Sequence, residues 1–144
     1  MKYWRFAMFF LPLLASCTAT ISEKSFLAPV RGGALTVEAL RQAAQVYRLS
    51  EHTITAADGT RLYAVLLRQS GARATVLYFG GNGYTIGRFG AWTARQFAPL
   101  GVDIMIVDHR GYGQSGGSPS QAALEADGLA AFDHIVEMLS LIHI

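Results

Sequence analysis

The sequence predicts an α/β fold in which an antiparallel hairpin leads into a mostly parallel sheet with flanking helices. Residues 51–69 have a hairpin pattern, and two apolar, β-rich runs follow, ATVLYF (74–79) and VDIMIVD (102–108), separated by a helical pattern. Apolar runs without alternation suit strands that are buried on both faces. A strand, a helix and a strand in this order pair in parallel through a right-handed crossover.

The first elements are a helix and the hairpin. Residues 36–49, TVEALRQAAQVYRL, combine good helix formers with apolar residues at helical spacing. These apolar residues are Val37, Leu40, Ala44 and Tyr47. The following stretch alternates over residues 52–55, reaches Asp58-Gly59 and continues as a second strand. Asp-Gly is a strong turn pair, since both residues tolerate positive φ.

Two more helices are expected around the later strands. The first runs from about Arg88 to Leu100 and ends at Gly101, a residue suited to a helix C-terminus. Its expected core contacts are Phe89, Trp92 and Phe97. The second begins at Ser118-Pro119-Ser120-Gln121, where serine caps, proline takes the first helical position and glutamine closes a capping box. It is expected to reach about Met138, with an apolar face of Leu124, Leu129, Phe132, Ile135 and Val136.

The N-terminal 17 residues, MKYWRFAMFFLPLLASC, have the pattern of a secretory signal, with Lys2 and Arg5 before an apolar run and small residues after it. The run is shorter than the roughly 20 residues that a membrane-spanning helix needs. Leu14-Ala15-Ser16-Cys17 resembles the lipobox of bacterial lipoproteins, which implies lipidation of Cys17. Thr18, being other than Asp, implies sorting to the outer membrane. The alternative is a plain signal peptide with an incidental cysteine.

The organisation that follows is a signal over 1–17, a tether over 18–35 and a single domain over 36–144. Cys17 is the only cysteine, which excludes an internal disulfide. Removal of Lys2 and Arg5 from the 12 basic residues leaves ten, which balance the ten acidic residues. A chain without net charge has no basic footprint, so nucleic acid is not an expected partner. The expected partners are a membrane and a small-molecule or peptide substrate.

Three pieces of the sequence, DGTRLYAVLL, TVLYFGGNG and GVDIMIVDHRGYGQSGGSPS, together resemble the α/β-hydrolase superfamily over residues 50–138. The closest branch is that of the serine aminopeptidase-like and monoacylglycerol-lipase-like hydrolases. The resemblance implies a serine hydrolase that needs no cofactor and acts on ester, thioester or amide bonds.

In this superfamily the loop after the third strand supplies one backbone donor of the oxyanion hole. By position, the expected donor is the N–H of Asn82, with Gly81 beside it, and Gly80 lets the backbone turn tightly. The usual loop begins with His-Gly, whereas this chain has Gly80-Gly81. The donor is a backbone group, so its chemistry does not require the histidine.

Ser115 lies in Gly113-Gln114-Ser115-Gly116-Gly117, which has the form G-x-S-x-G, but we do not assign it as a nucleophile. A nucleophile elbow lies directly between a strand and a helix, whereas Ser115 follows Asp108, the end of a strand, by seven residues. The resemblance implies that residues 109–117 are the loop after strand four. Asp108 and Arg110 are expected to form an ion pair that stabilises this loop.

The nucleophile, the acid and the catalytic histidine are therefore expected beyond Ile144, in which case this chain is an inactive N-terminal fragment. A small complete domain is the alternative. Whether residues 139–144, which end the chain in LSLIHI, belong to the native gene stays open.

The other titratable residues are expected to have structural or surface roles. The four histidines show no metal-ligand spacing, so no metal site is predicted. They are His52, His109, His134 and His143. Asp127 and Asp133 are expected to be either solvated charges or charges in the N-terminal half of the last helix.

Two further functions stay open. Residues 81–87, GNGYTIG, differ by one residue from the dinucleotide fingerprint, and Asp108 could serve as the ribose-binding acid. Against this, Asp108 is 27 residues beyond Gly81, where the fingerprint expects about 20. The other alternative is a lipid-anchored α/β binding protein without catalysis.

Overall fold

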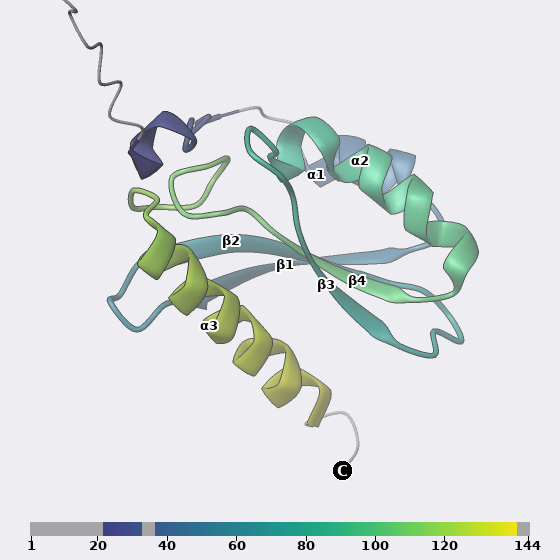
Figure 1. Ribbon diagram of the computed structural model, residues 1–144. Coiled ribbons are helices and arrows are strands. Elements are labelled where there is room, and N and C mark those ends of the chain that lie inside the picture. The colour runs from purple at the N-terminus through teal and green to yellow at the C-terminus, as the bar shows by residue number, and fades with distance from the viewer. Residues whose placement is uncertain (1–21, 33–36, 141–144) are drawn as a thin grey trace, which may run out of the picture.

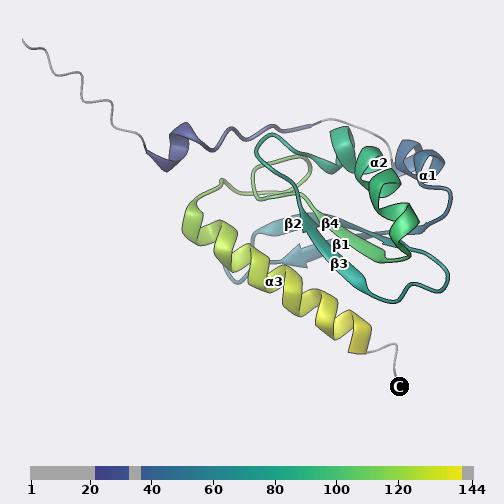
Figure 2. The ribbon, with the colours of Figure 1, turned by 45° about the vertical axis from the view of Figure 1, so that its right-hand side comes forward.

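The computed structural model describes residues 22–32 and 37–140, which form a mixed sheet with helices on both faces (Figure 1). The spatial order of the four described strands is β1-β2-β4-β3. The strands are β1 (Arg48–Thr55), β2 (Arg61–Arg68), β3 (Thr75–Phe79) and β4 (Asp103–Val107). Helices α1 (Val37–Ala43) and α2 (Ile86–Phe97) cover one face and α3 (Gln121–Ser140) the other (Figures 1 and 2). The predicted signal, Cys17 and His143 lie outside the described residues.

The strand pairing confirms the predicted topology. β1 and β2 form the antiparallel hairpin, and β2 also pairs antiparallel with β4. β3 pairs in parallel with β4, with Thr75 opposite Asp103, so α2 is the crossover of a parallel unit. β4 is central and buried, as expected for 102–108. β3 is the outer strand of the described sheet and all five of its residues are only partly buried, so the prediction of two buried faces is wrong for it in this part of the chain.

Alternate residues of the strands form two apolar cores, one on each face of the sheet. On one face Val65, Leu67 and Ile104 pack against α1 and α2. On the other face Leu66, Met105 and Val107 pack against α3. The alternation follows from the period of two along a strand, which sends neighbouring side chains to opposite faces.

The predicted helix over 36–49 is too long. α1 ends at Ala43, a turn follows in which the Tyr47 N–H donates to Ala44 O at 2.8 Å, and β1 begins at Arg48. Helix α2 starts two residues before the predicted Arg88 and continues after Phe97 as a short 3-10 helix, η2 (Ala98–Leu100). Gly101 has φ of 66° and ends it in the left-handed conformation, as predicted.

The buried face of α2 is made of small residues, and this corrects the predicted core contacts. Gly90, Thr93 and Ala94 are buried together with Ile86, whereas Phe89 and Trp92 are exposed. A Cβ at Gly90 would lie 3.2 Å from Ile86 Cγ2 and 3.7 Å from Leu40 of α1. The close approach of α1 and α2 therefore selects small residues, and the aromatic side chains face outward. Phe97 does pack on this core.

The predicted start and face of α3 also need correction. α3 begins at Gln121, and Ser120 rather than Ser118 caps it, with Ser120 Oγ accepting from the Ala123 N–H at 3.3 Å. Asp127, Ala131 and Ile135, spaced four residues apart, form the buried stripe. Of the predicted apolar face, Leu129, Phe132 and Val136 are exposed.

Arg110 ties three segments together through a buried ion pair. Its Nε and Nη2 donate to the two carboxylate oxygens of Asp127 at 2.8 and 2.6 Å, and Nη1 donates to Asp58 Oδ2 at 2.6 Å. The expected pairing of Arg110 with Asp108 is therefore wrong, and so is the expectation that Asp127 is solvated. The bonds to Asp127 and Asp58 raise the pKa of Arg110 further, and the bond from Arg110 lowers that of Asp58.

Asp127→Asn should destabilise the chain by about 3 kcal/mol, the lower end of the cost of breaking a buried ion pair, since the exposed Asp58 still contacts Arg110. Urea denaturation followed by circular dichroism measures this loss. Asp133→Asn is the matched control, because Asp133 is exposed on the same helix, and it should change stability by less than about 0.5 kcal/mol. Equal midpoints for the two variants would contradict the structural role of the pair.

His52 and His134 join β1 to α3. His134 Nε2 lies 3.4 Å from His52 Nδ1, the two rings meet edge to face, and the other nitrogen of His52 bonds Ser50 Oγ at 2.9 Å. Burial lowers the pKa of His52, and the charges of His134 and Arg68 lower it further. The folded chain therefore holds His52 in its neutral form more strongly than the unfolded chain does.

Stability should consequently fall as the pH drops below about 6.5, the ordinary pKa of histidine, because the unfolded state binds the proton more readily. Urea midpoints measured at pH 7.5 and 5.5 test this. His52→Gln removes the titrating ring and should reduce the difference between the two midpoints. An unchanged difference would show that other groups cause the pH dependence.

Candidate active site

In the part of the chain that the structure describes, the loop between β3 and α2 has backbone N–H groups without acceptors, among them those of Gly81 and Asn82. The Tyr84 N–H donates to Gly81 O at 3.0 Å, and Gly83 has φ of 78°, so residues 81–84 form a tight turn. Within the described residues, no acceptor binds the N–H of Gly81 or Asn82, and both residues are exposed. Exposed N–H groups in a fixed turn can bind an oxygen that becomes negatively charged during a reaction.

Gly80 holds the base of this turn. A Cβ at Gly80 would overlap the ring of Tyr84, so only glycine lets this ring pack against the backbone. Gly80 O lies 3.0 Å from His109 Nε2. The Tyr84 hydroxyl bonds Thr93 Oγ1 at 2.7 Å, and burial raises the pKa of Tyr84 to about 12. The turn is thus held by His109 in the loop after β4 and by Thr93 of α2.

The Asn82 side chain is held by distant residues. Its Oδ1 accepts from the Tyr112 hydroxyl at 2.8 Å and from the Ala28 N–H at 3.3 Å, and its Nδ2 donates to Phe26 O at 2.6 Å. The side chain is therefore occupied, whereas the backbone N–H stays open. Sequence reasoning missed these contacts, because Phe26 and Ala28 are more than fifty residues away and no local pattern links them to Asn82.

Asp108 connects this loop to the one after β4. Its buried carboxylate accepts from the Ile86 N–H at the start of α2, at 2.7 Å, and from the Gln114 N–H at 3.1 Å. Burial raises the pKa of Asp108, and the two N–H bonds oppose this. Gly113 packs on the carboxylate so closely that a side chain there would overlap it. Asp108 therefore joins both loops through backbone donors rather than through Arg110.

Ser115 lies inside the wall of the second loop. Its buried hydroxyl donates to Asp108 O at 2.6 Å and accepts from the Tyr63 N–H at 2.8 Å. Both roles of the hydroxyl are thus taken by backbone groups, and it is directed at β2 and β4 rather than at solvent.

Part of the predicted tether packs across these two loops. We call residues 22–32 the strap, which includes the 3-10 helix η1 (Glu23–Ser25). Gly113 and the strap exchange two backbone bonds, from Gly113 N–H to Val30 O at 2.8 Å and from Gly32 N–H to Gly113 O at 3.3 Å. The Gln121 N–H, at the start of α3, donates to Glu23 Oε2 at 3.0 Å. Both ribbon views show the strap lying over the loops (Figures 1 and 2).

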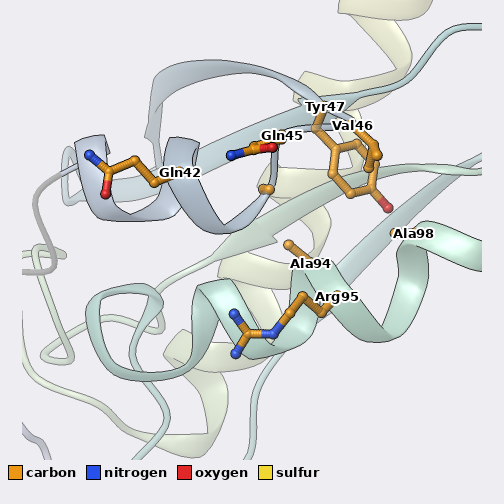
Figure 3. Close-up of a pocket in the computed structure, with 8 residues that line it drawn as sticks. Gln42, Gln45, Val46, Tyr47, Ala94, Arg95 and Ala98 are labelled. Carbon is orange, nitrogen blue, oxygen red and sulfur yellow. The ribbon is translucent and has the colours of Figure 1, made fainter.

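Two surface cavities lie at opposite ends of α2. A shallow one of about 220 Å³ adjoins the turn and is lined by Gly81, Asn82, Tyr84, Phe89 and Trp92. Another, of about 400 Å³, lies between the turn after α1 and the second half of α2 (Figure 3). The second is lined partly by Tyr47, Ala94 and Arg95 and is remote from Asn82, so only the first adjoins the candidate donors.

Of the three histidines that the structure describes, only His52 and His134 contact each other. His109 stacks on Phe79 beneath the loop. No three His, Cys, Asp or Glu residues within 22–32 and 37–140 are grouped so that they could hold a metal ion. Among the helices described, none has the length and apolar character needed to span a bilayer.

Comparison with known proteins gives two kinds of match. No family profile matches the chain. Protein bem46 of Schizosaccharomyces pombe is 34% identical over 83 residues, covering 56% of this chain and 28% of the relative. The uncharacterized protein YfhR of Salmonella typhi is 36% identical over 89 residues, covering 58% of this chain and 30% of the relative. The aligned region is thus less than a third of the length of either curated relative.

Solved structures of hydrolases are among those that match this chain. An alpha-beta hydrolase from Vibrio vulnificus superposes with a TM-score of 0.60 at 24% identity, over 76% of this chain and 37% of that one. An esterase of Pyrococcus furiosus gives 0.59 at 16% identity, over 78% of this chain and 41% of that one. At these identities the likeness shows the fold.

Gly80→Ala should destabilise the loop, because the new methyl group overlaps the Tyr84 ring, and overpacking of this kind costs roughly 1–3 kcal/mol. Gly81→Ala is the matched control: the space around its Cβ is open, and its cost should stay below about 1 kcal/mol. Thermal unfolding of the two variants measures the difference. A Gly81→Ala variant less stable than Gly80→Ala would contradict the described packing of the turn.

Proposed function

From the α/β-hydrolase fold of this chain, we propose that it is part of an exported serine hydrolase that cleaves ester, thioester or amide bonds and is anchored to lipid through Cys17. The observation that carries the proposal is the open N–H of Asn82, in a turn that Gly80 and Asp108 hold between β3 and α2. This turn occupies the position of the oxyanion loop, as the sequence resemblance implies.

The proposed role of Asn82 is electrostatic. Attack on an acyl carbonyl moves negative charge onto the carbonyl oxygen, and a donor already aimed at that oxygen stabilises the transition state without reorganisation. The Asn82 side chain bonds Tyr112, Ala28 and Phe26, so the peptide that carries the N–H is held in place. On this proposal the nucleophile, its base and the acid come from residues after Ile144. The match to less than a third of each curated relative is consistent with a longer protein.

The dinucleotide alternative is less well supported by the site. A ribose-binding acid must present its oxygens to the ligand, but the Asp108 carboxylate is buried and accepts from Ile86 and Gln114. The Ile86 N–H lies at the start of α2, where a pyrophosphate would bind, and Asp108 already accepts from it. A binding protein without catalysis remains the alternative that the activity experiment below decides.

The lipid anchor is tested separately. Cells that express the chain with radiolabelled palmitate should incorporate the label, and Cys17→Ser should abolish it, because the thiol is the proposed acylation site. Label retained in Cys17→Ser would remove the anchor from the proposal and leave the hydrolase part untouched.

The hydrolase proposal is tested by Asn82→Pro in the protein read through beyond Ile144. Proline lacks the N–H and suits the position before a positive-φ glycine in a tight turn, so the turn should persist. Loss of one oxyanion donor lowers kcat about 10²–10³-fold. Hydrolysis of short acyl p-nitrophenyl esters measures it.

Asn82→Ala is the matched control, because it removes the same side-chain bonds but keeps the N–H, and its kcat should stay well above that of Asn82→Pro. Ser115→Ala should keep its kcat, because its hydroxyl bonds only backbone groups. Equal kcat for Asn82→Pro and Asn82→Ala would refute the oxyanion role, and no turnover by the longer protein would favour the binding alternative.

A further inference from the structure

Three exposed aromatic residues lie next to the candidate oxyanion turn or on the strap that is bonded to it. Phe26 of the strap is 65% exposed, and Phe89 and Trp92 of α2 are 39% and 53% exposed. Asn82 connects them, because its side chain bonds Phe26 O and it lines the shallow cavity together with Phe89 and Trp92. We call Phe26, Phe89 and Trp92 the aromatic rim. Exposed aromatic residues gathered at one site mark an interaction surface more strongly than scattered ones do.

An apolar groove continues this surface along the strap. It measures about 430 Å³ and runs between the strap and the first turns of α3. Its lining consists of the apolar Phe26, Leu27 and Leu124 together with the polar Glu23, Gln121 and Glu125. On the other side of the rim, the Arg88 guanidinium lies 5.3 Å from the centre of the Phe89 ring. The surface therefore combines apolar side chains with a cation beside Phe89 and with two carboxylates along the groove at the strap.

The position of Cys17 fixes which partner can reach this surface. Ser22, the first described residue of the strap, is five residues after Cys17. Five residues span at most about 18 Å even when fully extended. The strap is in turn bonded to Asn82, to Gly113 and to the start of α3. Acyl chains on Cys17 therefore cannot lie far from the end of the strap that carries Phe26.

We propose that the aromatic rim contacts the lipid bilayer and holds the candidate oxyanion turn at the membrane surface. This inference rests on the lipid anchor of the proposed function. Aromatic rings prefer the boundary between headgroups and acyl chains, where amphipathic surfaces bury their apolar side by about 5–10 Å. Arg88 lies where it can meet anionic headgroups. The substrates that fit this placement are amphiphilic acyl compounds presented by the membrane.

The strap decides the orientation of the domain. A free tether over the whole of 18–35 would let the domain rotate, because flexible linkers behave as random coils. Here the bonds of Phe26, Ala28 and Val30 to the two loops leave only the residues before Ser22 between the domain and the anchor. The short remaining length favours one face toward the bilayer, and that face carries the candidate site.

Trp92 is a natural probe of this contact. The chain has two tryptophans, Trp4 and Trp92, and removal of the signal leaves Trp92 alone. The lipidated chain reconstituted into phosphatidylethanolamine–phosphatidylglycerol vesicles should show Trp92 emission shifted to the blue and quenched about twofold by brominated acyl chains, as expected for a ring buried at the acyl boundary. Quenching by aqueous acrylamide should decrease in parallel.

The matched control moves the probe to the other end of α2. Trp92→Phe combined with Leu100→Trp puts the only tryptophan at another exposed position, remote from Asn82, and brominated lipid should leave its emission unchanged. Phe26→Ser should weaken the quenching of Trp92, because it removes one ring of the rim. A chain made from Thr18 onward, without lipid, should not bind the vesicles.

The outcomes separate this inference from the proposed function. Palmitate on Cys17 with equal brominated-lipid quenching of Trp92 and of the Leu100→Trp control would overturn the membrane contact but keep the anchor. Shielding of Trp92 from acrylamide without quenching by brominated lipid would also overturn it, and would show that a later segment or a second copy covers the rim.

Discussion

The structure of the candidate site depends on one buried carboxylate. Asp108 directly follows β4, an inner strand of the described sheet, and burial of a charge there is costly unless donors surround it. The donors are backbone N–H groups of Ile86 and Gln114, one from each loop at this edge of the sheet. The start of α2 adds a favourable dipole. Because one side chain satisfies both loops, displacement of either loop leaves a buried charge without a partner, so the two loops are held in a fixed relation. Ser115, bonded to the carbonyl of the same residue, belongs to this support.

The side chain and the backbone of Asn82 have separate roles on the proposed function. Its amide side chain joins the strap to Tyr112, whereas its N–H is open to solvent. Glycine at this position would leave the N–H in place but lose the contacts to the strap. Asparagine therefore links the N-terminal segment to the turn that would bind the oxyanion. On the proposed function, the anchored end of the chain and the reacting end of the sheet are mechanically connected through this residue.

The sequence predicted what local patterns encode and missed what distant contacts decide. The hairpin at Asp58-Gly59, the parallel pairing of β3 and β4 and the glycine at the end of α2 each depend on a few neighbouring residues, and all are confirmed. The partners of Arg110 were mispredicted, because Asp58 lies in the hairpin and Asp127 on α3, and both approach Arg110 only after these elements have packed. The face of α2 was misassigned for a related reason: periodicity locates a stripe, but only the spacing to α1 shows that Gly90 and Ala94, not Trp92, must face inward. The role of Asn82 as an oxyanion donor stays a prediction.

The outer position of β3 bears on where a nucleophile could lie. β3 runs in parallel with β4 and leads straight into Gly80 and the turn. On the proposed function, a further parallel strand paired with the open edge of β3 would end at the same edge of the sheet as Phe79. The residue that follows such a strand would then lie beside the turn, close to the N–H of Asn82. A serine in the loop after β4 has no such access, because Ser115 is directed into the sheet by its bonds to Asp108 and Tyr63. A G-x-S-x-G motif can therefore be catalytic when it follows a strand next to β3, and structural when it follows β4. The strand that precedes the motif decides which role its serine has.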